Sequence, residues 1–196
     1  MARIHQAASL NFVRRKTVKQ LLGASVASVG AAHSWAYSTV FISEEKASQL
    51  LLASADRFIS TALAFSEAQL RKIASTSQTK IPSGFAPQCV TGWANGTRVG
   101  WVLFDRVIGK YDLIDYAMGF LADSTSTGLE VLAYRESHGG EIRNTSWRQQ
   151  FVGKKGPQQL RAGDEIRNIS GATLSCQHVT EGAQRLSAVA ALLSAY

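Results

Sequence analysis

A series of short apolar segments, each of strand length and bounded by turn residues, constrains the fold of this chain more than any other feature. The series consists of CVTGWA (89–94), TRVGWVLFD (97–105), YDLIDYAMGF (111–120) and LEVLAYRE (129–136). Only Asn95-Gly96 separates the first two segments, and both residues accept the positive φ angles of a two-residue hairpin turn. The series therefore predicts consecutive antiparallel strands joined by tight turns.

Residues 43–73 carry a helical pattern ahead of these strands. Ser43 followed by Glu44 and Glu45 is typical of a helix start, because a hydroxyl caps free backbone N–H groups and acids favour the positive end of the helix dipole. Apolar residues then recur at helical spacing to about Ile73. The polar segment 75–88, with two of the three prolines, predicts a linker between a helical arm and the strands.

Two more helices are expected after the strands. NTSWRQQFV (144–152) predicts a short helix capped by Asn144 or Thr145, and residues 173–194 form an amphipathic helical pattern. Strands and helices do not alternate regularly, which argues against a parallel sheet. We therefore predict an α+β fold with a mainly antiparallel sheet, a C-terminal helix packed on it and an N-terminal helical arm.

The net charge of +7 resides mostly in the first 36 residues. This segment holds five basic residues and no acidic one, which leaves 16 basic against 14 acidic residues in the remainder. A nearly neutral domain lacks the positive surface that binding to phosphate backbones requires. We expect no nucleic-acid partner.

The same segment, residues 1–36, predicts an export signal or an N-terminal membrane anchor. The basic stretch RRKTVK (14–19) precedes a run of small and apolar residues, and Ser34-Trp35-Ala36 offers small residues at the positions that signal peptidase reads. Arg14-Arg15 resembles the start of a twin-arginine signal. We expect a periplasmic or other extracytoplasmic location, with an amphipathic cytosolic helix as the alternative interpretation. The rest divides into a helical arm at 37–80 and a main domain at 81–196.

The segment Ser170-Gly171-Ala172-Thr173-Leu174-Ser175 is the most specific chemical feature of the chain. It begins the last predicted helix, where backbone N–H groups are unpaired and the helix dipole is positive. Small residues let a ligand approach the backbone, and two hydroxyls lie in the first turn. These properties suit a phosphate group, although a plain Ser or Thr helix cap is the commoner meaning of such a string.

This segment resembles the flavinylation motif of the FMN-binding domain family, Asp-x-x-Ser/Thr-Gly-Ala-Thr. The family includes the flavinylated subunits of sodium-pumping NADH:quinone oxidoreductase and of the Rnf complex. The resemblance implies that Thr173 is joined to the phosphate of FMN by a flavin transferase. Ser170, Gly171 and Ala172 then complete the core of the motif, with Leu174 and Ser175 extending it. One position departs from the motif, since Arg167 stands where the family has aspartate.

The resemblance extends over residues 88–190. GLEVLAYRESHGGEI (128–142) resembles the strand and turn that the family places against the flavin, with Glu136, Ser137, Gly139 and Gly140 matching its Glu-Thr/Ser-x-Gly turn. It implies an extracytoplasmic electron-transfer flavoprotein that is a redox carrier rather than an independent enzyme, with a membrane oxidoreductase as its electron donor or acceptor. The departure at Arg167 leaves two alternatives open: FMN held without a covalent bond, or a structural partner that carries no cofactor.

The remaining chemical residues give weaker patterns. Cys89 and Cys176 could pair in an oxidising compartment or remain separate thiols, and sequence separation decides neither. With His138 and His178 they could supply four zinc ligands, but Cys176 and His178 are two apart on a predicted helix and point about 200° apart. We expect no metal site, and we expect both histidines to be solvated polar residues.

Overall fold

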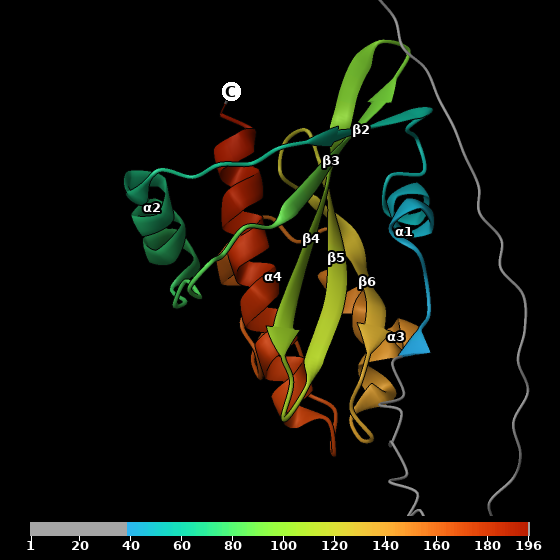
Figure 1. Ribbon diagram of the computed structural model, residues 1–196, viewed down its shortest axis with the longest axis vertical. Helices are drawn as coiled ribbons and strands as arrows, with labels where there is room; N and C mark the ends of the chain where they lie inside the picture. Colours follow the sequence, from blue (N-terminus) through green and yellow to red (C-terminus); the bar gives the residue numbers. More distant parts are fainter. Residues whose placement is uncertain (1–38, 196) are drawn as a thin grey trace, which may run out of the picture. The chain divides into compact units, whose positions relative to one another are not determined.

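The computed structural model describes residues 39–195 and shows a six-stranded antiparallel sheet (Figure 1). Across the sheet the strands follow the order β1-β6-β5-β4-β3-β2. Their bounds are β1 Thr39–Val40, β2 Arg57–Thr61, β3 Gln88–Ala94, β4 Thr97–Ile108, β5 Leu113–Leu121 and β6 Ser126–Tyr134. The predicted α+β fold with a mainly antiparallel sheet is confirmed.

Helices cover both faces of this sheet. The α-helices are α1 (Glu44–Leu51), α2 (Glu67–Ser77), α3 (Thr145–Arg148) and α4 (Thr173–Leu193), and the 3₁₀ helices are η1 (Gly140–Arg143), η2 (Gln149–Phe151) and η3 (Pro157–Leu160). Figure 1 shows α4 on one face and α1 on the other, with α2 beside α4. None of the helices in the described part of the chain is long and apolar enough to cross a membrane.

The β3–β4 hairpin forms as the sequence predicts. Strands β3 and β4 pair up to Ala94 and Thr97, and the two residues between them have positive φ, 50° at Asn95 and 77° at Gly96. Both angles are those of the turn whose twist matches that of paired strands. Two consecutive residues therefore decide the register of the longest strand in the sheet.

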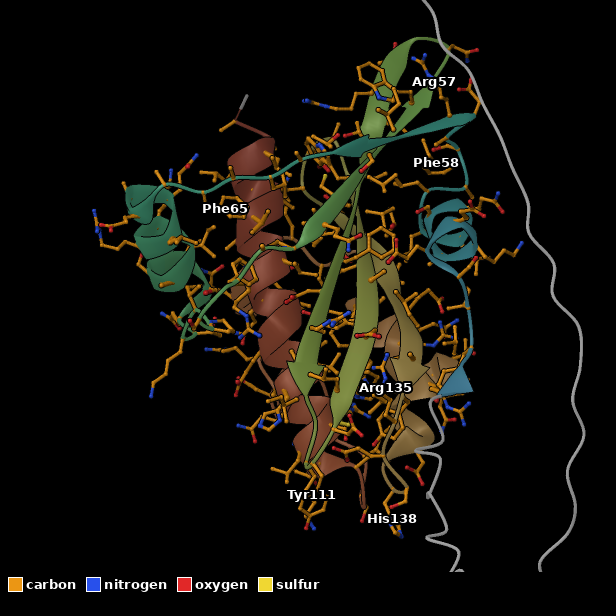
Figure 2. All side chains as sticks on the ribbon, viewed as in Figure 1. Arg57, Phe58, Phe65, Tyr111, Arg135 and His138 are labelled. Atoms are coloured by element: carbon orange, nitrogen blue, oxygen red, sulfur yellow. The ribbon has the colours of Figure 1, made fainter. Side chains whose placement is uncertain are left out.

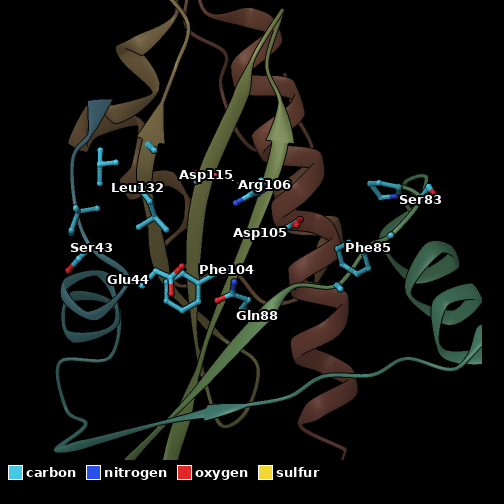
Figure 3. Close-up of a pocket in the computed structure, with 16 residues that line it drawn as sticks. Ser43, Glu44, Ser83, Phe85, Gln88, Phe104, Asp105, Arg106, Asp115 and Leu132 are labelled. Carbon is cyan, nitrogen blue, oxygen red and sulfur yellow. Dashed lines mark ion pairs between the residues drawn. The ribbon is translucent and has the colours of Figure 1, made fainter. Parts of the chain in front are cut away.

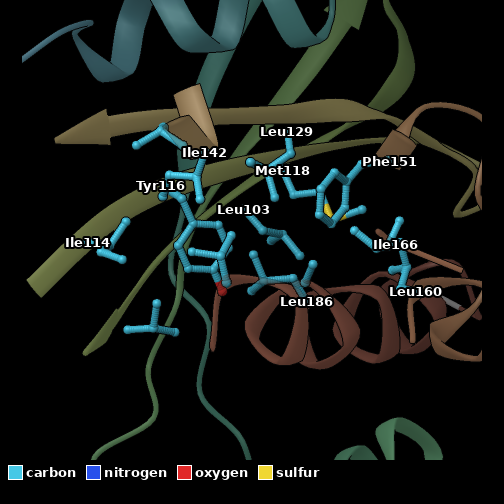
Figure 4. Packing of buried hydrophobic residues seen from close by; sticks show 14 of the residues in the cluster. Leu103, Ile114, Tyr116, Met118, Leu129, Ile142, Phe151, Leu160, Ile166 and Leu186 are labelled. Carbon is cyan, nitrogen blue, oxygen red and sulfur yellow. The ribbon is translucent and has the colours of Figure 1, made fainter. Parts of the chain in front are cut away.

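The larger of two hydrophobic cores lies between the sheet and α4. Figure 4 shows its centre, where Leu103, Tyr116 and Met118 from the strands meet Leu186 of the helix. Gly182 makes the close approach of α4 possible, because a Cβ atom at that position would lie 2.1 Å from the hydroxyl oxygen of Tyr116. A smaller core on the opposite face joins α1 to the sheet.

The N-terminal arm is not one helical segment, so the prediction of helix up to Ile73 is wrong in detail. Helix α1 starts as predicted, with Ser43 Oγ accepting a hydrogen bond from Lys46 N at 3.2 Å. It ends at Leu51, and β2 then pairs along β3 before α2 begins. The free edge of β3 takes up Arg57–Thr61 as a strand, so long-range pairing overrides the local helical spacing. The division of the chain near residue 80 stays a prediction.

Other elements differ from their predicted bounds. Helix α2 extends three residues into the predicted linker, and Phe85 within that linker packs against the larger core. The predicted helix 144–152 divides into α3 and η2, and Asn144 precedes it without a side-chain cap. The predicted export segment, residues 1–36, lies outside the described residues.

Both cysteines are free and buried in the structure. Burial raises the pKa of the Cys89 thiol to about 11, which keeps it protonated at neutral pH. Cys176 Sγ accepts a hydrogen bond from Ile169 N at 3.4 Å. Both thiols therefore act as small core residues.

Asp105 should make the free energy of unfolding depend on pH. Burial between the sheet and α4 raises the pKa of this carboxyl, against the hydrogen bond from the Tyr116 hydroxyl and the charge of Arg185. A raised pKa means that the folded state binds the proton more tightly, so the stability that Asp105 contributes is greatest at low pH and declines as pH rises through the folded-state pKa. We expect Asp105→Asn to be more stable relative to wild type at pH 7 than at pH 3.5.

Urea unfolding of both proteins at the two pH values measures this difference. Asp164→Asn is the control, because Asp164 is exposed beside Arg161 and should give a smaller change with pH. If the free energy of unfolding of Asp105→Asn, relative to that of the wild type, is lower at pH 7 than at pH 3.5, the folded state does not disfavour the carboxylate.

Candidate functional site

Helix α4 begins at Thr173 without a side-chain cap. The residue before it, Ala172, is buried and has φ −119° and ψ 19°. Gly171, with φ 85°, turns the chain into the helix, and a Cβ atom there would meet nothing within 4 Å. Thr173 and Leu174 are exposed. The start of a helix of 21 residues therefore presents its unpaired N–H groups, and the Thr173 side chain, to an open space.

The turn after β6 packs directly on this helix start. The Tyr134 hydroxyl donates to the backbone oxygen of His138 and lies 3.0 Å from Ser175 Oγ. Gly139 has φ 87°, and a Cβ atom there would lie 2.5 Å from the Tyr134 hydroxyl and 3.0 Å from Ser175 Oγ. Only glycine allows both the positive φ and this close approach. The turn and the helix start form one structural unit through Tyr134.

A second turn, between β4 and β5, closes the other side. Glu136 Oε1 accepts hydrogen bonds from Tyr111 N at 2.6 Å and from Asp112 N at 3.0 Å. From the helix, His178 Nδ1 lies 2.7 Å from the Ile108 carbonyl oxygen and 3.0 Å from that of Gly109. His178 thus holds the β4–β5 turn against α4, where we had expected a solvated polar residue.

These three segments enclose a cavity of about 540 Å³. Figure 2 shows Tyr111 and His138 at the same end of the molecule. The lining residues are Lys110, Tyr111, Asp112, Arg135, Glu136, Ser137, His138, Gly171, Ala172, Thr173, Leu174 and Ser175. The volume falls within the range of sites for cofactor-sized ligands, about 300–1,000 Å³. The cavity combines an uncapped helix N-terminus, which suits a phosphate, with room for a ring system.

The charged side chains of the cavity are largely engaged with the protein. Arg135 Nη2 lies 2.5 Å from Asp115 Oδ2, and its Nη1 donates to the Leu113 carbonyl at 3.1 Å. The Lys110 ammonium lies 4.8 Å from the centre of the Tyr111 ring, which is a cation–π contact. Lys110 is thus the cation of this cavity that is free of an ion pair among the described residues.

Seven of the ten predicted site residues line this one cavity. Ser170, Gly139 and Gly140 do not. Gly139 is buried against Tyr134 and Ser175, Gly140 follows it at the start of η1, and Ser170 is exposed before the helix. The sequence analysis did not assign Lys110, Tyr111, Asp112, Arg135 or His138 to the site. The motif at Glu136 identified the turn as part of the site but did not predict the hydrogen bonds of Glu136 to Tyr111 N and Asp112 N. Nothing in the sequence singled out Tyr134.

Arg167 does not line the cavity with Thr173. Its backbone N–H donates to Gln150 Oε1 at 2.9 Å, and its carbonyl accepts from Trp147 Nε1 at 2.8 Å. Its side chain is exposed and borders a separate cavity with Trp147 and Lys154. The position of the motif aspartate therefore lies on the surface next to the helix start, outside the space in which a ligand of Thr173 would lie.

A larger cavity, of about 700 Å³, lies over the sheet near the start of α1. Figure 3 shows Arg106 and Asp115 among its lining residues, and these two form an ion pair of 3.3 Å. None of the predicted site residues borders it. The larger cavity borders neither the start of α4 nor the turn at Glu136–His138, so the smaller cavity is the stronger candidate.

Glu136→Ala should loosen the β4–β5 turn. The variant removes the acceptor of two backbone N–H groups, and hydrogen bonds to a charged group contribute about 1.5–3 kcal/mol each when buried. Because Glu136 is only half-buried, we expect a smaller total loss of about 1–2 kcal/mol. Urea unfolding measures the loss, and amide hydrogen exchange at Tyr111 and Asp112 should become faster. Unchanged exchange at these two amides would contradict the assigned role.

Comparison with protein families supports the smaller cavity as a cofactor site. Residues 109–188 match the family described as FMN-binding domain. A comparison with curated proteins gives no match. The matched segment starts at Gly109. Strands β3 and β4, which the resemblance seen in the sequence included, therefore lie outside it. It holds all twelve residues that line the cavity. Residues 109–188 are therefore an FMN-binding domain, and the chain is a flavoprotein with FMN as its cofactor.

Proposed function

We propose that this chain is an extracytoplasmic electron-transfer flavoprotein that carries FMN covalently through a phosphoester to Thr173. One observation carries the proposal. Thr173 lies exposed at the uncapped start of α4, in the cavity that the family turn at Glu136–His138 also lines. A phosphoester at this hydroxyl would place the phosphate at unpaired N–H groups and the ring within reach of that turn.

The residues of the cavity would hold the flavin and control its surroundings. The isoalloxazine ring supplies the redox chemistry when FMN is bound. The N–H groups at the start of α4 would stabilise the negative phosphate, and the turn held by Tyr134 and Ser175 would offer backbone N–H groups to the ring. A covalent bond prevents loss of FMN from a protein that has left the cytoplasm.

The proposed location and partners rest on the sequence alone. Residues 1–36 support export to the periplasm or a comparable compartment, with cleavage or retention as an anchor both open. The partners would be a flavin transferase and a membrane oxidoreductase that donates or accepts electrons. The resemblance to flavinylated subunits of electron-transport complexes supports a redox carrier rather than an independent enzyme.

Arg167 favours a second candidate function. If the transferase requires a carboxylate at this position, the protein would bind FMN without a covalent bond. The exposed position of Arg167, outside the cavity, is compatible with such binding, because the side chain does not occupy the space of the ligand.

Coexpression of the chain with a flavin transferase tests the proposal. After denaturing electrophoresis we expect the polypeptide band to fluoresce under ultraviolet light. Peptide mapping by mass spectrometry should then place one FMN, less one water, on the peptide that contains Thr173. Flavin that colours the native protein but leaves on acid precipitation would support non-covalent binding, and a colourless native protein would contradict the assignment of FMN as the cofactor.

A further inference from the structure

His138 occupies the variable position of the glycine turn, between Ser137 and Gly139. Its backbone is fixed on both sides, since its carbonyl accepts from the Tyr134 hydroxyl and the next residue packs against Ser175. Its imidazole borders the cavity. Nδ1 lies 2.9 Å from Ser137 Oγ, and Nε2 has no hydrogen-bond partner among the described residues. The free ring nitrogen is therefore available to a ligand in the cavity.

Most of the other charged groups around His138 have partners within the protein, and Glu141 is exposed. Arg135 is paired with Asp115, and Glu136 is bonded to the amides of the β4–β5 turn. From that turn, Asp112 accepts from Leu113 N, and Lys110 lies on Tyr111. From η1 come Glu141 and Arg143; Arg143 donates to the Gly140 carbonyl and lies over Phe41. The first turn of α4 carries no charged residue.

His138 is the one imidazole among the residues that line the cavity, and imidazole is the side chain that proteins commonly use to bind and release a proton near neutral pH. Reduction of a flavin by two electrons and one proton leaves a negative charge on the ring. A second proton can then be bound either by the ring or by a neighbouring base. Among the side chains that line the cavity, the imidazole of His138 is the best placed to respond to that charge, because it borders the cavity and its Nε2 has no hydrogen-bond partner among the described residues.

We propose that His138 adds to the pH dependence of the potential of the bound flavin, because its imidazolium donates from Nε2 to the negatively charged reduced ring. This inference rests on the proposed flavin site. In the complete step, two electrons from the donor protein and one proton reduce the ring to its anion, and one further proton from solvent binds to His138. The positive charge stabilises the anion where it develops.

Addition of sulfite to the oxidised flavin tests the proposal without an enzyme assay. Sulfite forms a bond to the ring through its lone pair, leaves a negative charge on the ring and bleaches its colour. The dissociation constants of the native wild type and of His138→Gln are compared at each pH, so that the ionisation of sulfite itself cancels in their ratio. At pH 6 we expect sulfite to bind the wild type about tenfold more tightly, the effect of one charge-assisted hydrogen bond. At pH 8.5 the ratio should approach one.

The midpoint potential should follow the same pattern. Spectroelectrochemical titration supplies the electrons, and a tenfold change in a two-electron equilibrium corresponds to about 30 mV. The potential of the wild type should exceed that of His138→Gln by this amount at pH 6 and converge with it at pH 8.5. His138→Arg keeps the positive charge at both pH values and should behave at pH 8.5 as the wild type does at pH 6.

Lys110→Gln is the matched control, because it removes a cation that lines the same cavity but is not an imidazole. Its effect on sulfite binding should be the same at pH 6 and pH 8.5. A His138→Gln ratio near one at pH 6, or one that does not change with pH, overturns the inference. Loss of the flavin on denaturation would refute only the proposed phosphoester. The role of His138 would still be tested, because the sulfite and potential titrations use the native protein. A native protein without flavin overturns both proposals.

Discussion

Thr173→Ala is expected to abolish covalent attachment of FMN completely. The phosphoester requires an oxygen nucleophile at the start of α4, and Thr173 supplies the exposed hydroxyl there. Ser175, the other hydroxyl of the first turn, is buried and engaged with Tyr134, so it cannot replace it. Fluorescence of the denatured polypeptide, normalised to protein stain after coexpression with a flavin transferase, measures the loss. The fold should be retained, because the removed atoms are exposed.

Two further substitutions test whether attachment requires a hydroxyl at position 173 in particular. Thr173→Ser keeps the hydroxyl and should retain some attachment, whereas Ser170→Ala removes an exposed hydroxyl outside the cavity and should retain most of it. Circular dichroism of each variant confirms that the fold is unchanged. A fluorescent Thr173→Ala band would show that another residue carries the flavin, and the assignment of Thr173 would be wrong.

Phe151→Ala should cause the largest loss of stability among the substitutions considered for this protein. Phe151 is completely buried and packs edge-on against Trp147, with ring centres 5.0 Å apart. Truncation of a buried phenylalanine costs about 3–5 kcal/mol, because apolar contact is lost and a cavity remains. The total stability of a domain is about 5–15 kcal/mol, so the variant should unfold at a much lower urea concentration.

Val152→Ala is the neighbouring control for this prediction. Val152 is 54% exposed, so its truncation should change the free energy of unfolding by less than about 0.5 kcal/mol. Urea unfolding of both variants, followed by tryptophan fluorescence and by circular dichroism, provides the comparison. Equal losses in the two variants would mean that the segment between β6 and α4 contributes little to the core.

The sequence alone determined the features that depend on neighbouring residues. Asn95-Gly96 set the β3–β4 hairpin because both residues tolerate positive φ. The small residues before Thr173 marked a helix start open to a ligand, and the helix does begin at Thr173. Glu136 and Ser137 identified the turn that lines the same cavity. Each of these features is encoded within a few consecutive residues, so local chemistry was sufficient.

The tertiary structure decided what depends on residues far apart in the chain. Arg57–Thr61 became a strand because the edge of β3 was free to pair with it, although its sequence continued a helical spacing. Tyr134 and His178 became part of the site because folding brings the turns at 138 and 109 onto the start of α4. Hydrogen bonds between segments separated by as many as 70 residues leave no local signal, because each partner is chosen by proximity in the fold.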